Sequence, residues 1–262
     1  MKKLTISLAF GFLLSGVAWA QPSRLDQVLR AKELRVCIWP DYYGISYRSP
    51  KTQQLSGIDI DMAGELAKDV GATLRFVDSS FARLIDDLEQ DRCDIAMFGI
   101  GITAQRQQNL RFSSPYLASG IFAITTRSNR RIQRWADIDM PGVAVAVAKG
   151  TYHEAAMRDS LKSANLLVTA APQGREQEVE SGRADVFMTD YPFSRRMLET
   201  TDWARLIEPP EPFHLTSYAY AMPLGDDRWH DRIERFVAAI KADGRLQKAA
   251  QRHKLAPIVL LK

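Results

Sequence analysis

The sequence has little of the chemistry that metal sites and covalent catalysis require. Its 262 residues include two cysteines and four histidines, and no two histidines have the close spacing typical of a zinc site. It contains no G-x-S-x-G motif, the turn that exposes the nucleophilic serine of many hydrolases. Asp59 and Asp61 are better explained as capping or first-turn acids of a helix than as a catalytic pair. We therefore expect no metal and no cofactor.

Long apolar runs are also absent, except at the N-terminus. There, two lysines precede the run LTISLAFGFLLSGV, and Ala18-Trp19-Ala20 fits an A-x-A cleavage site. The run is shorter than the ~20 residues that a membrane-spanning helix needs. The sequence predicts a signal peptide over residues 1–20 and a mature chain that is exported and soluble.

Neither sign of charge dominates the chain. Its 35 lysines and arginines face 31 aspartates and glutamates, which gives a formal net charge of +4. The one basic cluster, RSNRR at 127–131, fits a solvated loop, whereas nucleic-acid-binding proteins concentrate their basic residues on one face. We expect no nucleic-acid partner.

Two cysteines are too few for the disulfide framework of a small secreted domain. Cys37 and Cys93 each lie in or beside an apolar run that is typical of a strand. A bridge between neighbouring parallel strands is geometrically awkward. We therefore expect two buried free thiols.

Apolar strand-like runs alternate with helical patterns along the chain. Residues 33–100 predict a βαβαβ unit and residues 121–190 predict a second one, with a further strand and an amphipathic helix after them. This order predicts an α/β protein of two lobes, a clamshell in which each lobe is an open, mostly parallel sheet flanked by helices. The predicted lobes are residues 21–118 with 219–262, and residues 119–218, joined by two hinge crossings.

The stretch Gly99-Ile100-Gly101-Ile102-Thr103-Ala104 fits G-x-G-x-x-G/A, the turn that holds a dinucleotide pyrophosphate. That fingerprint also needs an acidic residue about 20 positions later, to bind the ribose. No aspartate or glutamate occurs between Gly99 and Ala136. We therefore reject a nucleotide-binding turn here.

Several residues at predicted strand ends have two explanations each. Arg106 can hold a carboxylate in a bidentate manner, or it can be an ordinary surface arginine. Asp190 is placed to bind an ammonium group, or to cap the helix that follows. Tyr42 and Phe81 can stack on a ligand, or they can close the core.

Five stretches together resemble the periplasmic solute-binding proteins of polar amino-acid ABC transporters, the family 3 type. They are LRVCIWPDYYGISY, LSGIDIDMAGELAKDVG, DSSFARLIDDLEQDRCDIAMFGIGITAQRQQNLRFSSPY, VAKGTYHEAA and GRADVFMTDYPFS, in the family's order. The resemblance implies a monomer in the periplasm that closes around a small-molecule ligand. It also implies that the ligand is delivered to a membrane ABC permease.

The resemblance also implies a ligand site. Arg106 would bind the ligand α-carboxylate, and Asp190 would receive the α-ammonium group. The remaining implied contacts are the aromatic rings of Tyr42 and Phe81 and the backbone and hydroxyl groups of Gly99, Gly101, Thr151, Tyr152 and His153.

Some residues depart from the family pattern. Gly44 and Ile45 follow Tyr43 where the family often has Pro-Phe, and Gly99 and Gly101 replace the usual serine or threonine. Tyr152 and His153 are bulkier than the usual small polar residues. These departures predict a reshaped pocket.

The same resemblance extends to the periplasmic cyclohexadienyl (arogenate/prephenate) dehydratases, through SRLDQVLRAKELRV, DRCDIAM and MTD. Such an enzyme needs a general acid within reach of the leaving hydroxyl. Glu154 is the first candidate for that acid and His153 the second, although Glu154 is better explained as a favourable acid at a helix N-terminus. A sensory or partner-presenting domain remains a third possibility.

Overall fold

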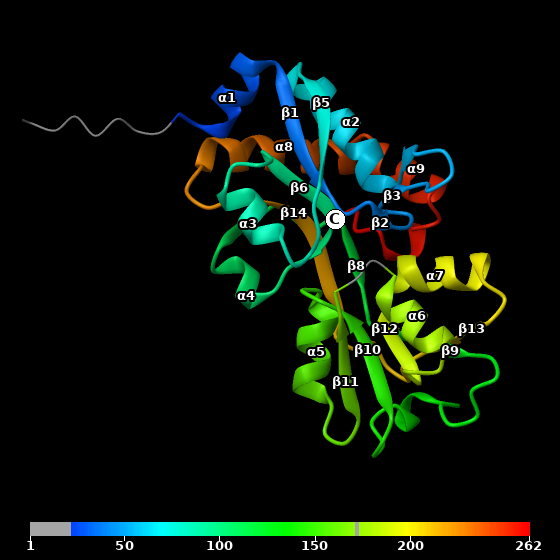
Figure 1. Cartoon of the computed structure of the whole chain (residues 1–262). Coiled ribbons are helices and arrows are strands. Elements are labelled where there is room, and N and C mark those ends of the chain that lie inside the picture. Colours follow the sequence, from blue (N-terminus) through cyan, green and yellow to red (C-terminus); the bar gives the residue numbers. More distant parts are fainter. Residues whose placement is uncertain (1–21, 171–172) are drawn as a thin grey trace, which may run out of the picture.

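The computed structural model describes residues 22–170 and 173–262. The predicted signal peptide at residues 1–20 lies outside the described residues. Two groups of helices and strands lie one above the other in Figure 1, with β8 and β14 at their junction. Among the helices of the described residues, none is long and apolar enough to cross a membrane.

The first lobe is built on a sheet in the order β5-β1-β6-β14-β7, with β8 also paired to β14. Its strands are β1 (Glu33–Ile38), β5 (Thr73–Asp78), β6 (Ile95–Gly101), β7 (Leu110–Phe112), β8 (Leu117–Ser119) and β14 (Thr216–Pro223). Its helices are α1 (Arg24–Ala31), α2 (Ile58–Val70), α3 (Leu84–Glu89), α4 (Ala104–Gln107), α8 (Asp227–Ala242) and α9 (Arg245–Arg252).

The second lobe is built on a sheet in the order β11-β10-β12-β9-β13. Its strands are β9 (Phe122–Thr126), β10 (Ala144–Ala148), β11 (Asn165–Thr169), β12 (Val186–Thr189) and β13 (Ala204–Ile207). Its helices are α5 (Tyr152–Ser160), α6 (Gly174–Glu180), α7 (Tyr191–Thr200) and the 3-10 turn η1 (Trp135–Asp137).

The predicted α/β architecture with two lobes is confirmed, and the structure refines its strand directions. In each sheet the three strands of the βαβαβ unit are parallel, β5-β1-β6 and β11-β10-β12. The strands added beside β6 and β12 are antiparallel. One reason is that β14 returns from the second lobe and enters the first sheet against the direction of β6.

A small third sheet lies beside the first lobe. It consists of β2 (Asp41–Tyr42), β3 (Ser46–Arg48) and β4 (Leu55–Ser56). The chain ends near the junction of the lobes, after the 3-10 turn η2 (Ala256–Ile258), where Leu260 donates its amide to the Tyr116 carbonyl at 2.8 Å. The C-terminal segment therefore packs beside the crossing at β8.

The two cysteines form a disulfide, so the expectation of free thiols is wrong. Cys37 lies in β1, but Cys93 lies in the turn before β6 begins at Ile95. Their Cα atoms are 5.6 Å apart, which a disulfide can span. The geometric objection applied to two residues within paired parallel strands, and Cys93 is not such a residue.

Candidate functional site

Arg106 lies in α4, the short helix after β6, and its side chain is buried between the lobes. The residue is 6% exposed, which excludes an ordinary surface arginine. Its Nη1 donates to the Gly101 carbonyl at 2.8 Å and its Nη2 donates to the Gly150 carbonyl at 3.0 Å. Gly101 ends β6 of the first sheet and Gly150 follows β10 of the second, so Arg106 contacts both lobes.

The charge of Arg106 has no carboxylate partner within the described residues. Its guanidinium contacts neutral carbonyls, and its Cζ lies 5.3 Å from the centroid of the Phe81 ring, a cation–π distance. Burial lowers the pKa of Arg106 to about 10, so the side chain stays protonated at neutral pH. The site therefore holds a buried cation whose charge no carboxylate of the described residues compensates.

Asp190 directly follows β12 and is 1% exposed. Its Oδ1 accepts the Phe193 amide at 3.2 Å and thereby caps α7, as the second explanation of this residue predicted. Its Oδ2 accepts hydrogen bonds from the hydroxyls of Tyr42 and Tyr218, the latter at 2.7 Å. Burial raises the pKa of Asp190, while the two tyrosine hydroxyls act to lower it.

Tyr42 and Phe81 belong to one aromatic cluster at the carboxyl end of the first sheet. Trp39 lies 5.3 Å from Tyr42 and 5.2 Å from Phe81, measured between ring centroids. Phe81 also contacts Phe98 of β6, with centroids 5.1 Å apart. The cluster forms an apolar wall beside Arg106.

Gly99 and Gly101 lie near the end of β6 and leave little room for a side chain. A Cβ atom at Gly99 would lie 2.9 Å from Cε1 of Tyr42, and the φ angle there is +61°. A Cβ atom at Gly101 would lie 2.9 Å from Cγ2 of Thr216. Gly99 and Gly101 are the positions at which the family often has serine or threonine. In this protein, neighbouring side chains fill the space that a side chain at either position would need.

The predicted Thr151-Tyr152-His153 turn begins α5 at the same edge. Thr151 Oγ1 donates to the Ala148 carbonyl at 2.7 Å, and the Tyr152 and Tyr218 hydroxyls are 3.2 Å apart. His153 is 5% exposed and neither ring nitrogen has a hydrogen-bond partner. Burial, followed by the charges of Arg175 and Arg106, lowers its pKa well below the usual value, so the imidazole is neutral.

Glu154 is held by its own lobe. Its Oε2 accepts the Gly150 amide at 2.7 Å, and its Oε1 accepts from Arg158 at 2.9 Å. Both carboxylate oxygens are thus used at the start of α5. This arrangement matches the structural explanation that the sequence favoured for Glu154.

Sequence reasoning missed three residues in or near the predicted ligand site: Trp39, Tyr218 and Arg175. Trp39 directly follows β1, so the strand-end argument that selected Tyr42 could have found it. Tyr218 lies in β14, a strand whose partners the sequence does not indicate. Arg175 lies in α6 and donates to the Met188 carbonyl at 3.0 Å, a contact that only tertiary structure reveals.

Two hollows open on either side of the contact between the lobes, and Phe81, Ala82, Lys149 and Thr151 line both of them. One measures about 600 Å³ and is also lined by Trp39, by Asp41 of β2 and by Thr169 of β11. The other measures about 430 Å³ and includes Arg106. Of the predicted ligand residues, Phe81 and Thr151 line both hollows and Arg106 lines the second.

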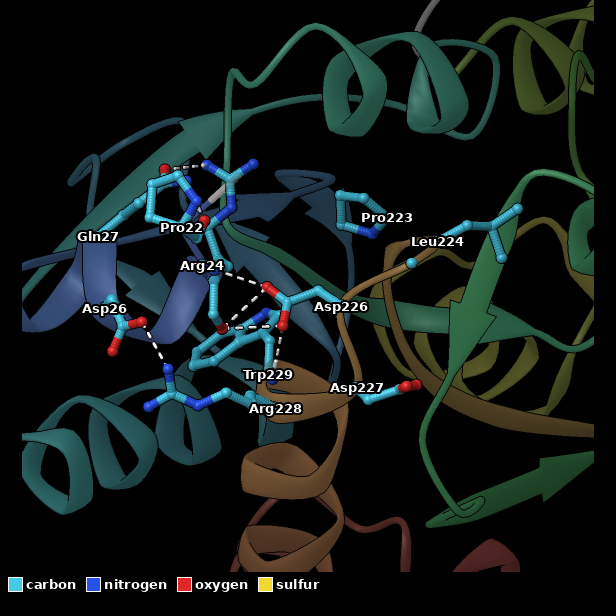
Figure 2. A pocket seen from close by; sticks show the side chains of 12 residues that line it. Pro22, Arg24, Asp26, Gln27, Pro223, Leu224, Asp226, Asp227, Arg228 and Trp229 are labelled. Carbon is cyan, nitrogen blue, oxygen red and sulfur yellow. Dashed lines mark hydrogen bonds and ion pairs between the residues drawn. The ribbon is translucent and has the colours of Figure 1, made fainter. Parts of the chain in front are cut away.

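A separate hollow lies on the outside of the first lobe, between α1 and the start of α8 (Figure 2). Asp226 accepts the backbone amides of Arg24 and Trp229 there, at 2.6 and 2.9 Å, and Arg228 donates to Asp26 at 2.6 Å. These contacts fix the ends of the two helices. None of the predicted site residues lines this hollow.

Comparison with protein families gives a match over residues 34–255, to the model of bacterial extracellular solute-binding proteins, family 3. The cyclohexadienyl dehydratase of Pseudomonas aeruginosa is 35% identical over 90% of this chain and 88% of its own length. The L-cystine-binding protein TcyJ of Escherichia coli is 23% identical over 96% of this chain and 93% of its own.

Solved structures give the same two-lobe fold. An ancestral amino acid-binding protein, a precursor of cyclohexadienyl dehydratase, superposes with a TM-score of 0.81 at 29% identity. The match covers 88% of this chain and 99% of that one. An amino acid ABC transporter substrate-binding protein of Streptococcus pneumoniae, bound to L-arginine, has a TM-score of 0.80 at 22% identity over 89% of this chain and 99% of that one.

Proposed function

Because the chain belongs to family 3 of the bacterial extracellular solute-binding proteins, we propose that it captures a small amino-acid-like or carboxylate solute between its lobes for a membrane ABC permease. The observation that carries this proposal is the buried guanidinium of Arg106, which contacts both lobes and has no carboxylate partner within the described residues. A buried cation is costly unless a partner compensates its charge. A ligand carboxylate would supply that partner.

Closure follows from the position of Arg106. We assign residues 21–118 and 219–262 to one lobe and residues 119–218 to the other, with hinge crossings near 117–121 and 216–221. A carboxylate on Arg106 would contact groups of both lobes, so it would bind the closed state better than the open one. The Thr151, Tyr152 and His153 turn and the rings of Tyr42 and Phe81 would enclose the rest of the solute.

The relatives support a solute of this class. TcyJ is named for L-cystine, and the Streptococcus pneumoniae protein was solved with L-arginine; both ligands carry a carboxylate. We further propose that the protein works in the periplasm as a monomer, after removal of residues 1–20.

Substitution of Arg106 tests the proposal directly. In Arg106→Ala we expect solute affinity to fall about hundredfold or more, since each charge-assisted hydrogen bond contributes roughly 1.5–3 kcal/mol. Calorimetric titration with the tightest ligand from a thermal-shift screen measures this. Arg111→Ala is the matched control, because Arg111 pairs with Asp227 on the surface. Unchanged affinity in a folded Arg106→Ala variant would contradict the proposal.

A second candidate function is that of the Pseudomonas aeruginosa relative, a cyclohexadienyl dehydratase. Its general acid would be Glu154 or His153. The oxygens of Glu154 are held by Gly150 and Arg158, and His153 is neutral, so the binding function has the stronger support. Incubation with prephenate or arogenate, followed by detection of phenylpyruvate or phenylalanine, separates the two. Turnover that disappears in Glu154→Gln or His153→Ala would favour the enzyme.

A further inference from the structure

We infer that the solute of this site is an organic acid without an α-ammonium group, because two tyrosine hydroxyls already occupy Asp190 of the second lobe: Tyr42 from the first lobe and Tyr218 from β14, at the crossing between the lobes. This inference rests on the proposed function and narrows its ligand class. An α-amino acid would need an acceptor for its ammonium group. Asp190 is the predicted acceptor, so its existing contacts decide the matter.

Three acceptor positions of Asp190 are used within the protein. Oδ1 accepts the Phe193 amide, and Oδ2 accepts from both Tyr42 and Tyr218. A carboxylate offers about four lone-pair positions, so these three hydrogen bonds leave one position, on Oδ1. Oδ2 already accepts two hydrogen bonds, and the side chain of Asp190 is almost completely buried. An ammonium group could therefore bind Oδ2 only by displacing a tyrosine hydroxyl.

Displacement would be unfavourable because both tyrosines are buried. Neither Tyr42 nor Tyr218 is exposed to solvent that could replace a lost partner, and a buried donor without a partner costs free energy. Tyr152 adds a third hydroxyl, 3.2 Å from that of Tyr218. Burial raises the pKa of all three tyrosines well above 10, so their hydroxyls keep their protons and act as donors.

The carboxylate of Asp190 is also stabilised without a ligand cation. It caps the N-terminus of α7, where the helix dipole favours negative charge, although burial still raises its pKa. Arg106 has only neutral carbonyls as hydrogen-bond partners. Neither group forms an ion pair within the described residues, but both acceptor positions of Asp190 Oδ2 are already filled.

Matched ligand pairs test the inference. Each pair differs only at the α position: 2-oxoglutarate with L-glutamate, phenylpyruvate with L-phenylalanine, and pyruvate with L-alanine. Calorimetric titration of the wild-type protein should give, for at least one pair, an affinity about tenfold or more higher for the oxo acid, a difference of roughly 1.4 kcal/mol.

Tyrosine variants show whether Asp190 is the cause. Tyr42→Phe and Tyr218→Phe each free an acceptor position, so the preference for the oxo acid should shrink. Tyr220→Phe is the matched control, because Tyr220 is buried in the same strand and its hydroxyl has no hydrogen-bond partner. Circular dichroism verifies folding; should Tyr218→Phe fail to fold, Tyr42→Phe carries the test.

The outcomes separate the inference from the proposed function. Tighter binding of the amino acids by the wild type, lost in Arg106→Ala, would overturn the inference and leave the proposed function standing. Equal binding within every pair, or a preference that Tyr42→Phe and Tyr218→Phe leave unchanged, would also overturn it. If no acid of either kind binds, or if binding does not depend on Arg106, both fail.

Discussion

At the residue scale, Gly99 links the backbone of β6 to the predicted site. Its amide donates to Asp59 Oδ2 at 2.8 Å, its φ angle is +61°, and the Tyr42 ring lies against its Cα. A side chain at this position would meet the ring that also binds Asp190. The stability of the strand and the position of Tyr42 therefore depend on the same glycine.

Gly99→Ala should destabilise the fold by about 1–3 kcal/mol, because it combines a positive φ with a clash against Tyr42. Urea denaturation at equilibrium measures the change. Gly64→Ala is the matched control: Gly64 lies inside α2, a Cβ atom there would have no neighbour within 4 Å, and alanine favours helix by about 1 kcal/mol. If Gly99→Ala is as stable as the wild type, Tyr42 does not pack tightly against Gly99.

Single residues also show how far the sequence could predict the site. Arg106 and Asp190 were selected because they follow apolar strands, and the structure places both in one buried cluster between the lobes. Tyr218 was not selected, since its strand enters the first sheet only after the chain returns from the second lobe. A contact across the lobes leaves no local pattern in the sequence.

At the scale of elements, the parallel strands and longer helices follow the predicted order because their hydrophobic periods are regular. The small sheet β2-β3-β4, in contrast, was not predicted. Its strands have two or three residues each, too few to show an alternating pattern. Such strands form through packing, which sequence patterns do not report.

Asp59 in α2 is a second example of a packing contact that the sequence pattern did not predict. The N-cap of α2 is Gly57, so the capping explanation of Asp59 is wrong, although the residue does lie in the first turn. Its carboxylate is buried and accepts from the Gly99 amide and the Tyr116 hydroxyl, at 2.8 and 2.6 Å. Asp61, in contrast, pairs with Arg252 and His253 and holds α9 against α2.

The buried Asp59 makes stability depend on pH. Burial raises the pKa of Asp59 to about 7 in the folded state, against 3.8 for the ordinary side chain. The folded protein thus binds more protons than the unfolded chain between these values, so the free energy of unfolding should fall as pH rises from about 4 to 7. The loss from this residue is at most about 4 kcal/mol, at 1.36 kcal/mol per pKa unit.

Asp59→Asn should flatten this part of the pH profile, because the amide does not ionise. Its Oδ1 can still accept from Gly99 and Tyr116. Urea denaturation of both proteins at pH 4, 5.5 and 7 measures the difference. Parallel profiles for the two proteins would show that Asp59 does not cause the dependence.

At the scale of the whole molecule, contacts at the rim of the cleft add to those at its centre. Arg196 of α7 lies over the Tyr47 ring at 4.6 Å, donates to the Tyr47 hydroxyl at 3.3 Å, and is 3.7 Å from Asp41. Asp41 and Tyr47 belong to the small sheet of the first lobe. The sheet that the sequence did not predict is therefore the partner of α7 across the cleft.

Removing this rim contact should shift the protein toward the open state. In Arg196→Ala we expect a larger radius of gyration without ligand by small-angle X-ray scattering. We also expect ligand affinity to fall about threefold to tenfold, since binding must then supply more of the free energy of closure. Arg195→Ala is the matched control, because Arg195 pairs with Glu199 of its own helix. An unchanged radius and affinity in Arg196→Ala would mean that the central contacts of Arg106 and Asp190 alone hold the lobes together.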